Sequence, residues 1–313
     1  MPITLRPASC FLRRHLAASA LAVFASSTAL LPAQTTLFSE NFTGATVGSV
    51  SPNTKTVTNS TRVWRSTLDA GVSTVTLPTD STTGPNEGSA DKAMYVSPSS
   101  SATGYIAKFT ATTLAVGDTL TLSFDYRFTI APSTGTASGV RFGLYDSKGT
   151  DYTVPTADTY DNNDKGYRVY SAASSSSLAG SLSKEDGGDG SGNAGSAGGG
   201  SGDNTLLGSP TNFNQSTTTA RYSFSITRDS ATQVSFGLSI NGTNRLSSSV
   251  TDSSSAIFTF DELLIGAGTA TAYAFDNVTV VFTPSAVPEP SAYALLFSAL
   301  AGAAVITTRR QRR

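Results

Sequence analysis

The feature that most constrains the fold of this chain is a strict alternation of apolar and polar side chains between Thr119 and Ile130. Every second residue of the segment is apolar: Leu120, Leu122, Phe124, Tyr126, Phe128 and Ile130. Successive side chains of a strand point to opposite faces, whereas a helix would spread the same residues around its circumference. The segment is therefore predicted to be a strand with one face on a core and the other in water.

The same alternation recurs along the chain, and no segment between residues 34 and 284 shows a sustained helical period. Further strands are predicted at 140–144, 222–226, 234–240, 257–265 and 273–282, with weaker candidates at 57–64 and 105–109. Asn241-Gly242 follows one of them and is typical of a tight hairpin turn. Many short strands predict an all-β fold, a two-sheet antiparallel jelly-roll sandwich over residues 34–284.

Residues 174–204 interrupt this pattern. The stretch consists mainly of Ser, Gly, Ala and Asp and has no apolar periodicity. Such a composition buries too little apolar surface to offset the entropy of ordering the chain. It is therefore predicted to be a flexible loop inserted between two strands.

Residues 1–33 have the parts of a secretory signal peptide. Arg6, Arg13 and Arg14 supply the basic start, and an apolar stretch rich in Ala and Leu runs over residues 16–31. This stretch is shorter than the roughly 20 residues that a membrane span requires, which favours a cleaved signal helix over an anchor. The Sec machinery is then a partner of the chain during export.

Removal of the signal peptide changes which chemistry is available. The only Cys and the only His of the chain are Cys10 and His15. A mature protein without them has no disulfide, no thiolate nucleophile, no Ser-His-Asp triad and no His- or Cys-bound zinc. The two terminal segments also hold seven of the 21 basic residues but one of the 22 acidic residues, so the remainder carries a net charge of about −7. An acidic body without a basic cluster argues against nucleic-acid binding.

The C-terminal end also has three parts, a Pro-rich motif, an apolar run over residues 292–306 and a basic end. The motif residues are Val287, Pro288, Glu289, Pro290 and Ser291, and the basic ones are Arg309, Arg310, Arg312 and Arg313. In such a stop-transfer arrangement the apolar run enters the bilayer as a transmembrane helix, and the Arg side chains stay on the cytoplasmic side. The rigid motif is then left at the outer face of the inner membrane, open to a processing enzyme.

This order of motif, apolar helix and basic end, at residues 285–313, resembles the PEP-CTERM sorting signal of Gram-negative bacteria. The resemblance implies a membrane exosortase that cleaves near the Pro-Glu-Pro motif after a transient membrane-anchored stage. It further implies an exported protein of the cell envelope, cell surface or extracellular matrix, linked to exopolysaccharide and biofilm. It concerns sorting and leaves the activity of the body open.

Two short motifs in the body resemble those of concanavalin A-like and carbohydrate-binding jelly-roll modules. They are Phe-Ser-Glu-Asn-Phe at 38–42 and Phe-Asp-Asn-Val at 275–278. The resemblance implies that the first and last strands pair, and that Glu40 and Asp276 hold a structural Ca2+ ion. The alternatives are that both carboxylates are solvated, with Asp276 capping a turn, or that calcium binds at residues 161–164.

The residues that bear on activity are tyrosines and carboxylates. Sugar binding usually needs exposed aromatic rings, and Tyr152, Tyr160 and Tyr167 are the candidate glycan contacts, unless these rings fill the core. Glycoside hydrolysis needs two carboxylates flanking the bond, and the Glu-x-Asp-x-x-Glu pattern of laminarinase-like relatives is absent. We therefore expect a non-catalytic surface or matrix component that binds exopolysaccharide. The alternatives are a carbohydrate-active hydrolase or lyase and a purely structural matrix protein.

Overall fold

The computed structural model describes residues 33–42, 56–58, 63–66, 75–76, 93–96, 103–129, 139–149, 164–171, 180–186, 204–211, 213, 217–246, 249–268 and 272–285. All of them belong to one compact unit, Leu31–Val287. Apart from residues 33 and 285, the predicted signal peptide and sorting segment lie outside these ranges. Within the ranges, the secondary structure consists of strands, and no helix has the length and hydropathy that a membrane span requires.

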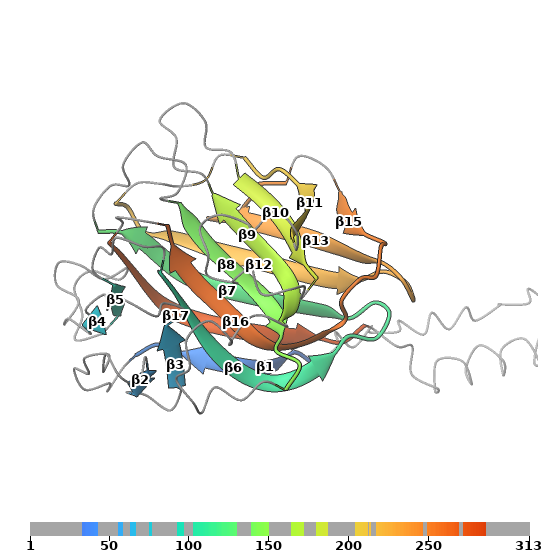
Figure 1. Ribbon diagram of the computed structural model, residues 1–313, viewed down its shortest axis with the longest axis horizontal. Helices are drawn as coiled ribbons and strands as arrows, with labels where there is room; N and C mark the ends of the chain where they lie inside the picture. Colours follow the sequence, from blue (N-terminus) through green and yellow to red (C-terminus); the bar gives the residue numbers. More distant parts are fainter. Residues whose placement is uncertain are drawn as a thin grey trace, which may run out of the picture. The chain divides into compact units, whose positions relative to one another are not determined.

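The strands form two antiparallel sheets (Figure 1). The nine-stranded sheet has the order β14 (Thr243–Asn244), β13 (Val234–Ile240), β12 (Ala220–Arg228), β7 (Thr119–Phe128), β17 (Tyr273–Thr283), β5 (Met94–Val96) and β4 (Val75–Thr76). Two further strands join it, since β1 (Thr35–Glu40) pairs with β17 and β15 (Val250–Asp252) pairs with β13. The eight-stranded sheet has the order β11 (Asn204–Gly208), β10 (Gly180–Glu185), β9 (Lys165–Ser171), β8 (Val140–Asp146), β16 (Thr259–Ala267), β6 (Thr103–Thr113), β3 (Val63–Ser66) and β2 (Thr56–Thr58).

The core lies between the two sheets and is rich in aromatic rings. Phe124 of β7 packs against Phe142 of β8 with ring centroids 5.2 Å apart, and Tyr167 of β9 packs against Phe236 of β13 at 4.7 Å. Along β7 the buried residues alternate with half-buried ones as far as Tyr126, as the sequence predicts. Facing sheets that interdigitate in this way form a sandwich, so the predicted two-sheet all-β fold is confirmed.

The ends of the body meet, as the jelly-roll resemblance implied. β1 pairs antiparallel with β17, with Thr36 opposite Val281 and Glu40 opposite Val278. The predicted hairpin turn is also present, since Asn241 and Gly242 have φ of 51° and 75° between β13 and β14. Both residues tolerate this left-handed region, which a two-residue hairpin loop requires.

One prediction is wrong over part of its range. Gly180–Glu185, which falls within the flexible loop predicted for residues 174–204, is strand β10 and pairs with β9 and β11 on its two sides. Leu182 of this strand is fully buried in the core, and the ladder hydrogen bonds satisfy the backbone. Composition misled the prediction because a strand with partners on both sides gains stability from its backbone pairing as well as from apolar side chains.

A carboxylate fastens the end of β17 to the turn between β6 and β7. Asp118 Oδ2 accepts a hydrogen bond from Ala115 N at 2.8 Å, and Oδ1 accepts one from Ser285 N at 2.8 Å. The same turn is tied to β12, since Gly117 N donates to Arg228 O at 2.7 Å and Arg228 N donates to Asp118 O at 3.0 Å. We call these contacts the Asp118 clasp; they hold the last described residue of the body in place.

Candidate functional site

Fully buried charged residues gather on the face of the eight-stranded sheet that points away from the core. Glu262 and Asp164 have no exposed surface, and Glu185 and Arg141 are 1% exposed. Charged side chains are almost never buried to this degree unless they are paired or serve a site. Because this face is not the core, its charges make it the candidate functional surface of the described residues.

Strand register brings these residues together in one row. Glu262 of β16 lies opposite Lys108 of β6 on one side and opposite Tyr145 of β8 on the other. Tyr145 lies opposite Gly166 of β9, and Gly166 lies opposite Glu185 of β10. Directly opposite residues share a sheet face, so these five residues form a continuous line across the sheet. We call them the polar row: Lys108, Glu262, Tyr145, Gly166 and Glu185.

Glycines allow the Tyr145 ring to lie against the sheet. A Cβ atom at Gly166 would be 2.4 Å from Tyr145 Cδ1, and one at Gly143 would be 2.8 Å from Tyr145 Cε2. Ile106 and Leu264 pack with the ring in a small apolar cluster of their own, separate from the main core. The ring is thereby held over the two glycines, with its hydroxyl among the charged side chains of the face.

The Tyr145 hydroxyl lies in an acidic environment. Burial raises the pKa of Tyr145 well above its ordinary value. Glu185, Glu262 and Asp164 raise this pKa further, while Arg168 lowers it. Tyr145 Oη is buried and has no hydrogen-bond partner among the described residues. At neutral pH the group is therefore a protonated phenol that can donate a hydrogen bond.

A second network adjoins the polar row. Ser147 donates to Asp261 from both its backbone N, at 2.8 Å to Oδ1, and its Oγ, at 2.6 Å to Oδ2. Lys108 Nζ donates to Ser147 Oγ at 2.9 Å. The strand register shifts between Phe260 and Glu262, where the single residue Asp261 of β16 lies against residues 109–111 of β6. The network thus holds one carboxylate and one ammonium group close to Glu262.

The far end of this face carries a guanidinium group on an aromatic ring. Arg141 lies over the Tyr170 ring, with Cζ 4.9 Å from the ring centroid. Burial lowers the pKa of Arg141 to about 10, so the side chain is charged at neutral pH. The face therefore combines carboxylate acceptors with guanidinium, ammonium and phenol donors.

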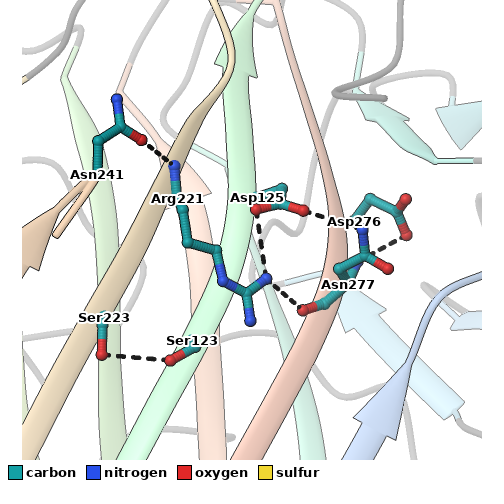
Figure 2. Close-up of polar contacts among 7 residues, drawn as sticks. All are labelled: Ser123, Asp125, Arg221, Ser223, Asn241, Asp276 and Asn277. Atoms are coloured by element: carbon teal, nitrogen blue, oxygen red, sulfur yellow. Dashed lines mark hydrogen bonds and ion pairs between the residues drawn. The ribbon is translucent and has the colours of Figure 1, made fainter. Parts of the chain in front are cut away.

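The outer face of the nine-stranded sheet carries a different set of contacts (Figure 2). Asp125 accepts hydrogen bonds from Arg221 Nη1 at 3.3 Å and from Asn277 Nδ2 at 2.9 Å, and Arg221 Nη1 also donates to Asn277 O at 2.9 Å. Ser123 Oγ donates to Ser223 Oγ at 3.2 Å on the same face. The Arg221 side chain is 41% exposed. These groups satisfy one another's hydrogen-bonding capacity across three strands. We therefore assign them a structural role.

The structure does not bring Glu40 and Asp276 together as ligands of one ion. Glu40 lies opposite Val278, a core residue, and its Oε1 accepts a hydrogen bond from Phe42 N at 2.8 Å. Asp276 lies opposite Asp125, which points away from the core, and the register shifts between Asp276 and Thr279. The bulge therefore places the two carboxylates on opposite faces of the sheet. Among the described residues there is also no group of three His, Cys, Asp or Glu side chains that could hold a metal ion.

Tyr167 is not an exposed sugar contact, so this prediction is wrong. Its side chain is fully buried between the sheets. Its hydroxyl donates to Asp252 Oδ2 at 2.8 Å and accepts a hydrogen bond from Ile257 N at 2.8 Å. The ring therefore belongs to the main core between the two sheets. Tyr152, Tyr160, the motif Val287–Ser291 and the basic residues 309–313 lie outside the described residues.

Sequence reasoning did not select Tyr145, Glu185 or Glu262. These residues are far apart in the sequence, and strand register alone puts them in one row. The available signal was the glycine at 143 within a predicted strand, because a strand glycine often marks close approach of another group.

No family model matches the chain, and no curated protein matches its sequence. Among solved structures, it is similar to a legume lectin-like domain from Entamoeba histolytica (13% identity, 64% of this chain and 88% of that chain, TM-score 0.40). It is also similar to a protein with a galectin-like fold from Bacillus subtilis (13%, 71% and 90%, TM-score 0.42). A carbohydrate esterase from the Shiga toxin-encoding bacteriophage phi24B matches as well (14%, 81% and 100%, TM-score 0.42). At these identities and scores the matches assign no function to this chain.

Proposed function

We propose that this chain is an exported, non-catalytic component of the cell surface or extracellular matrix, and that its sandwich body binds a glycan on the outer face of the eight-stranded sheet. The observation that carries the proposal is the polar row around Tyr145. These groups are at most 1% exposed, so a glycan reaches them only when this face opens; its hydroxyls can then donate to the carboxylates of Glu262 and Glu185 and accept from the Tyr145 phenol.

Binding of polysaccharides tests the proposal directly. Residues 34–287 contain the whole described core and can be produced as one body. We expect this body to be retained on an immobilised polysaccharide, and the variants Tyr145→Phe and Glu262→Gln to be retained less. The matched control is Asp125→Asn, which removes a carboxylate from the opposite sheet. Equal retention of all four proteins, or retention of none, would contradict the proposal.

Export and sorting form the second part of the proposed function. The signal peptide at 1–33 would pass the chain to the Sec machinery, and the PEP-CTERM-like segment at 285–313 would pass it to an exosortase. The Asp118 clasp holds Ser285, the last described residue of the body, two residues before the motif begins at Val287. Deleting residues 287–313 should release the protein into the medium. Undiminished surface retention of the truncated chain would count against this sorting route.

A carbohydrate-active hydrolase or lyase is the second candidate. The observation in its favour is that three carboxylates, of Glu185, Glu262 and Asp164, act on one buried tyrosine hydroxyl. Glu262 and Glu185 are three strands apart, roughly 14 Å between backbones, so these two do not have the spacing of a glycosidase pair. The catalytic carboxyl groups of glycosidases lie only about 5–9.5 Å apart. Turnover of a polysaccharide that Glu262→Gln or Glu185→Gln abolishes would replace the binding proposal with the enzymatic one.

A further inference from the structure

We infer that the fold withholds the residues just before the sorting motif from the processing enzyme, so that processing requires Ser285 to leave its place on the body. This inference rests on the sorting part of the proposed function and adds a control step to it. The observations that carry it lie in the β6–β7 turn, where Gly117 and Asp118 together hold Ser285. We call these two residues the Ser285 seat.

The chain is held beyond the end of its last strand. The ladder of β17 ends at Thr283, which lies opposite Thr119 of β7. Pro284 follows and has no N–H group, so it cannot donate a further ladder hydrogen bond. The next backbone donor is Ser285 N, and Asp118 Oδ1 accepts its hydrogen bond at 2.8 Å. The body thus fixes the chain two residues after the strand has ended.

Gly117 makes room for Ser285. A Cβ atom at this position would be 2.6 Å from Ser285 Cβ and 3.3 Å from Ser285 Oγ, which is too close for a side chain. The backbone of Gly117 has a φ of 90°, a conformation that residues with side chains rarely adopt. Its N donates to Arg228 O at 2.7 Å, which ties the turn to β12. The turn is therefore shaped so that Ser285 fits against it.

The carboxylate of Asp118 is fixed within the turn that presents it. Asp118 is 6% exposed, and its Oδ2 accepts a hydrogen bond from Ala115 N at 2.8 Å. Asp118 N also donates to Ala115 O at 3.0 Å. A hydrogen bond from a backbone N–H to an ionised carboxylate is stronger than a neutral one. Such a bond keeps the state in which Ser285 is released below roughly a tenth of the molecules.

The sequence leaves little chain between the seat and the motif. The motif begins at Val287, two residues after Ser285, and the predicted membrane-spanning run begins at residue 292. The residues from 286 to 292 reach at most about 25 Å, so an enzyme at the membrane works within that distance of the body. An enzyme that binds its peptide as an extended strand forms main-chain hydrogen bonds over several residues. Binding that extends more than one residue upstream of the motif needs the backbone of Ser285, which the seat holds.

Lengthening the chain between the seat and the motif tests this step without altering the body. The sequence Gly-Ser-Gly-Ser is inserted between Ser285 and Ala286 of the full-length chain, which adds up to about 13 Å of reach. We expect processing at least about tenfold faster than in the unaltered chain, because the enzyme then finds enough chain while Ser285 stays seated. Pulse labelling in the producing cells measures the rate, and mass spectrometry of the mature C-terminus locates the cut.

Substitutions assign the effect to the seat. Asp118→Ala removes the acceptor of Ser285 N and should speed processing of the chain of ordinary length by a similar factor. In the lengthened chain the same substitution should change the rate by less than about twofold, because the inserted residues already supply what the seat withholds. Asp229→Ala is the control, since its carboxylate accepts hydrogen bonds from Ser235 and Gln233 after β12 and it should leave both rates unchanged.

The outcomes separate this inference from the proposed function. Absence of a cut near residues 287–291 in every chain overturns the sorting route, and the inference with it. A cut there at equal rates in the unaltered and the lengthened chain, or at a lower rate in the lengthened chain, overturns the inference alone. Because the lengthened chain keeps every residue of the body, this comparison does not depend on whether Asp118→Ala folds.

Discussion

Replacing Asp118 by Ala should open the clasp that holds the end of β17 to the β6–β7 turn. The Asp118 carboxylate accepts two backbone hydrogen bonds, from Ala115 N and Ser285 N, both at 2.8 Å, and the residue is 6% exposed. A hydrogen bond to a charged group contributes about 1.5–3 kcal/mol, so losing both should lower the free energy of unfolding by roughly 3–5 kcal/mol. For a domain of this size the melting temperature should fall by roughly 10 °C.

Urea unfolding of residues 34–287 measures this loss. The variant Asp118→Asn keeps one acceptor oxygen, so it should lose about half as much stability as Asp118→Ala. The control is Asp229→Ala, since Asp229 accepts hydrogen bonds from Ser235 and Gln233 at the surface and should cost less than about 1 kcal/mol. A loss in Asp118→Ala no larger than that of the control would refute the assignment of the clasp.

Three other predictions concern the core and the polar row. Gly166→Ala places a Cβ 2.4 Å from both Leu144 O and Tyr145 Cδ1. It should therefore lower the free energy of unfolding by about 1–3 kcal/mol, measured as a lower urea midpoint. An unchanged midpoint would show that the Tyr145 ring is not held there. Tyr167→Phe removes a buried hydroxyl that bridges Asp252 and Ile257, and calorimetry should show a loss of roughly 2 kcal/mol, whereas a neutral effect would mean that the bridge adds nothing. Burial raises the pKa of Tyr126, Tyr145 and Tyr273 in the folded protein. Their contribution to stability is therefore complete below the ordinary tyrosine pKa of about 10, which applies to the unfolded chain. It is lost as the pH rises towards the higher pKa values of the folded protein. The urea midpoint should therefore be steady from neutral pH to about pH 9 and fall above about pH 10. Phenolate absorbance of the folded protein should rise only above the ordinary tyrosine pKa. A rise at the ordinary pKa would contradict the burial of these rings.

The strands that the sequence predicted well have one face in water. In β12 and β13 the buried residues alternate with half-buried ones over most of the strand, so apolar and polar side chains alternate in the sequence too. β9 and β16 are different, because most of their residues are buried on both faces. A strand buried on both faces loses the period of two, which explains why β9 was not predicted and why the start of β16 was placed too early.

The candidate site could not be predicted for a different reason. The polar row joins residues from β6, β16, β8, β9 and β10, whose order in the sheet differs from their order in the sequence. Its members become neighbours only through the register of five strands, and no local motif encodes that register. The resemblance of the two end motifs to jelly-roll modules did predict the pairing of the first and last strands, but the bulge after Asp276 turned that carboxylate away from Glu40.

Hydrogen exchange of residues 34–287, with and without a saturating oligosaccharide, tests the central claim most directly. The claim is that the ligand occupies the outer face of the eight-stranded sheet around Tyr145. Slower exchange should then appear in β8, β9 and β16, while β7 and β12 of the other sheet keep their rates. Protection confined to β7, β12 and β17, where Asp125 and Arg221 lie, would contradict the claim.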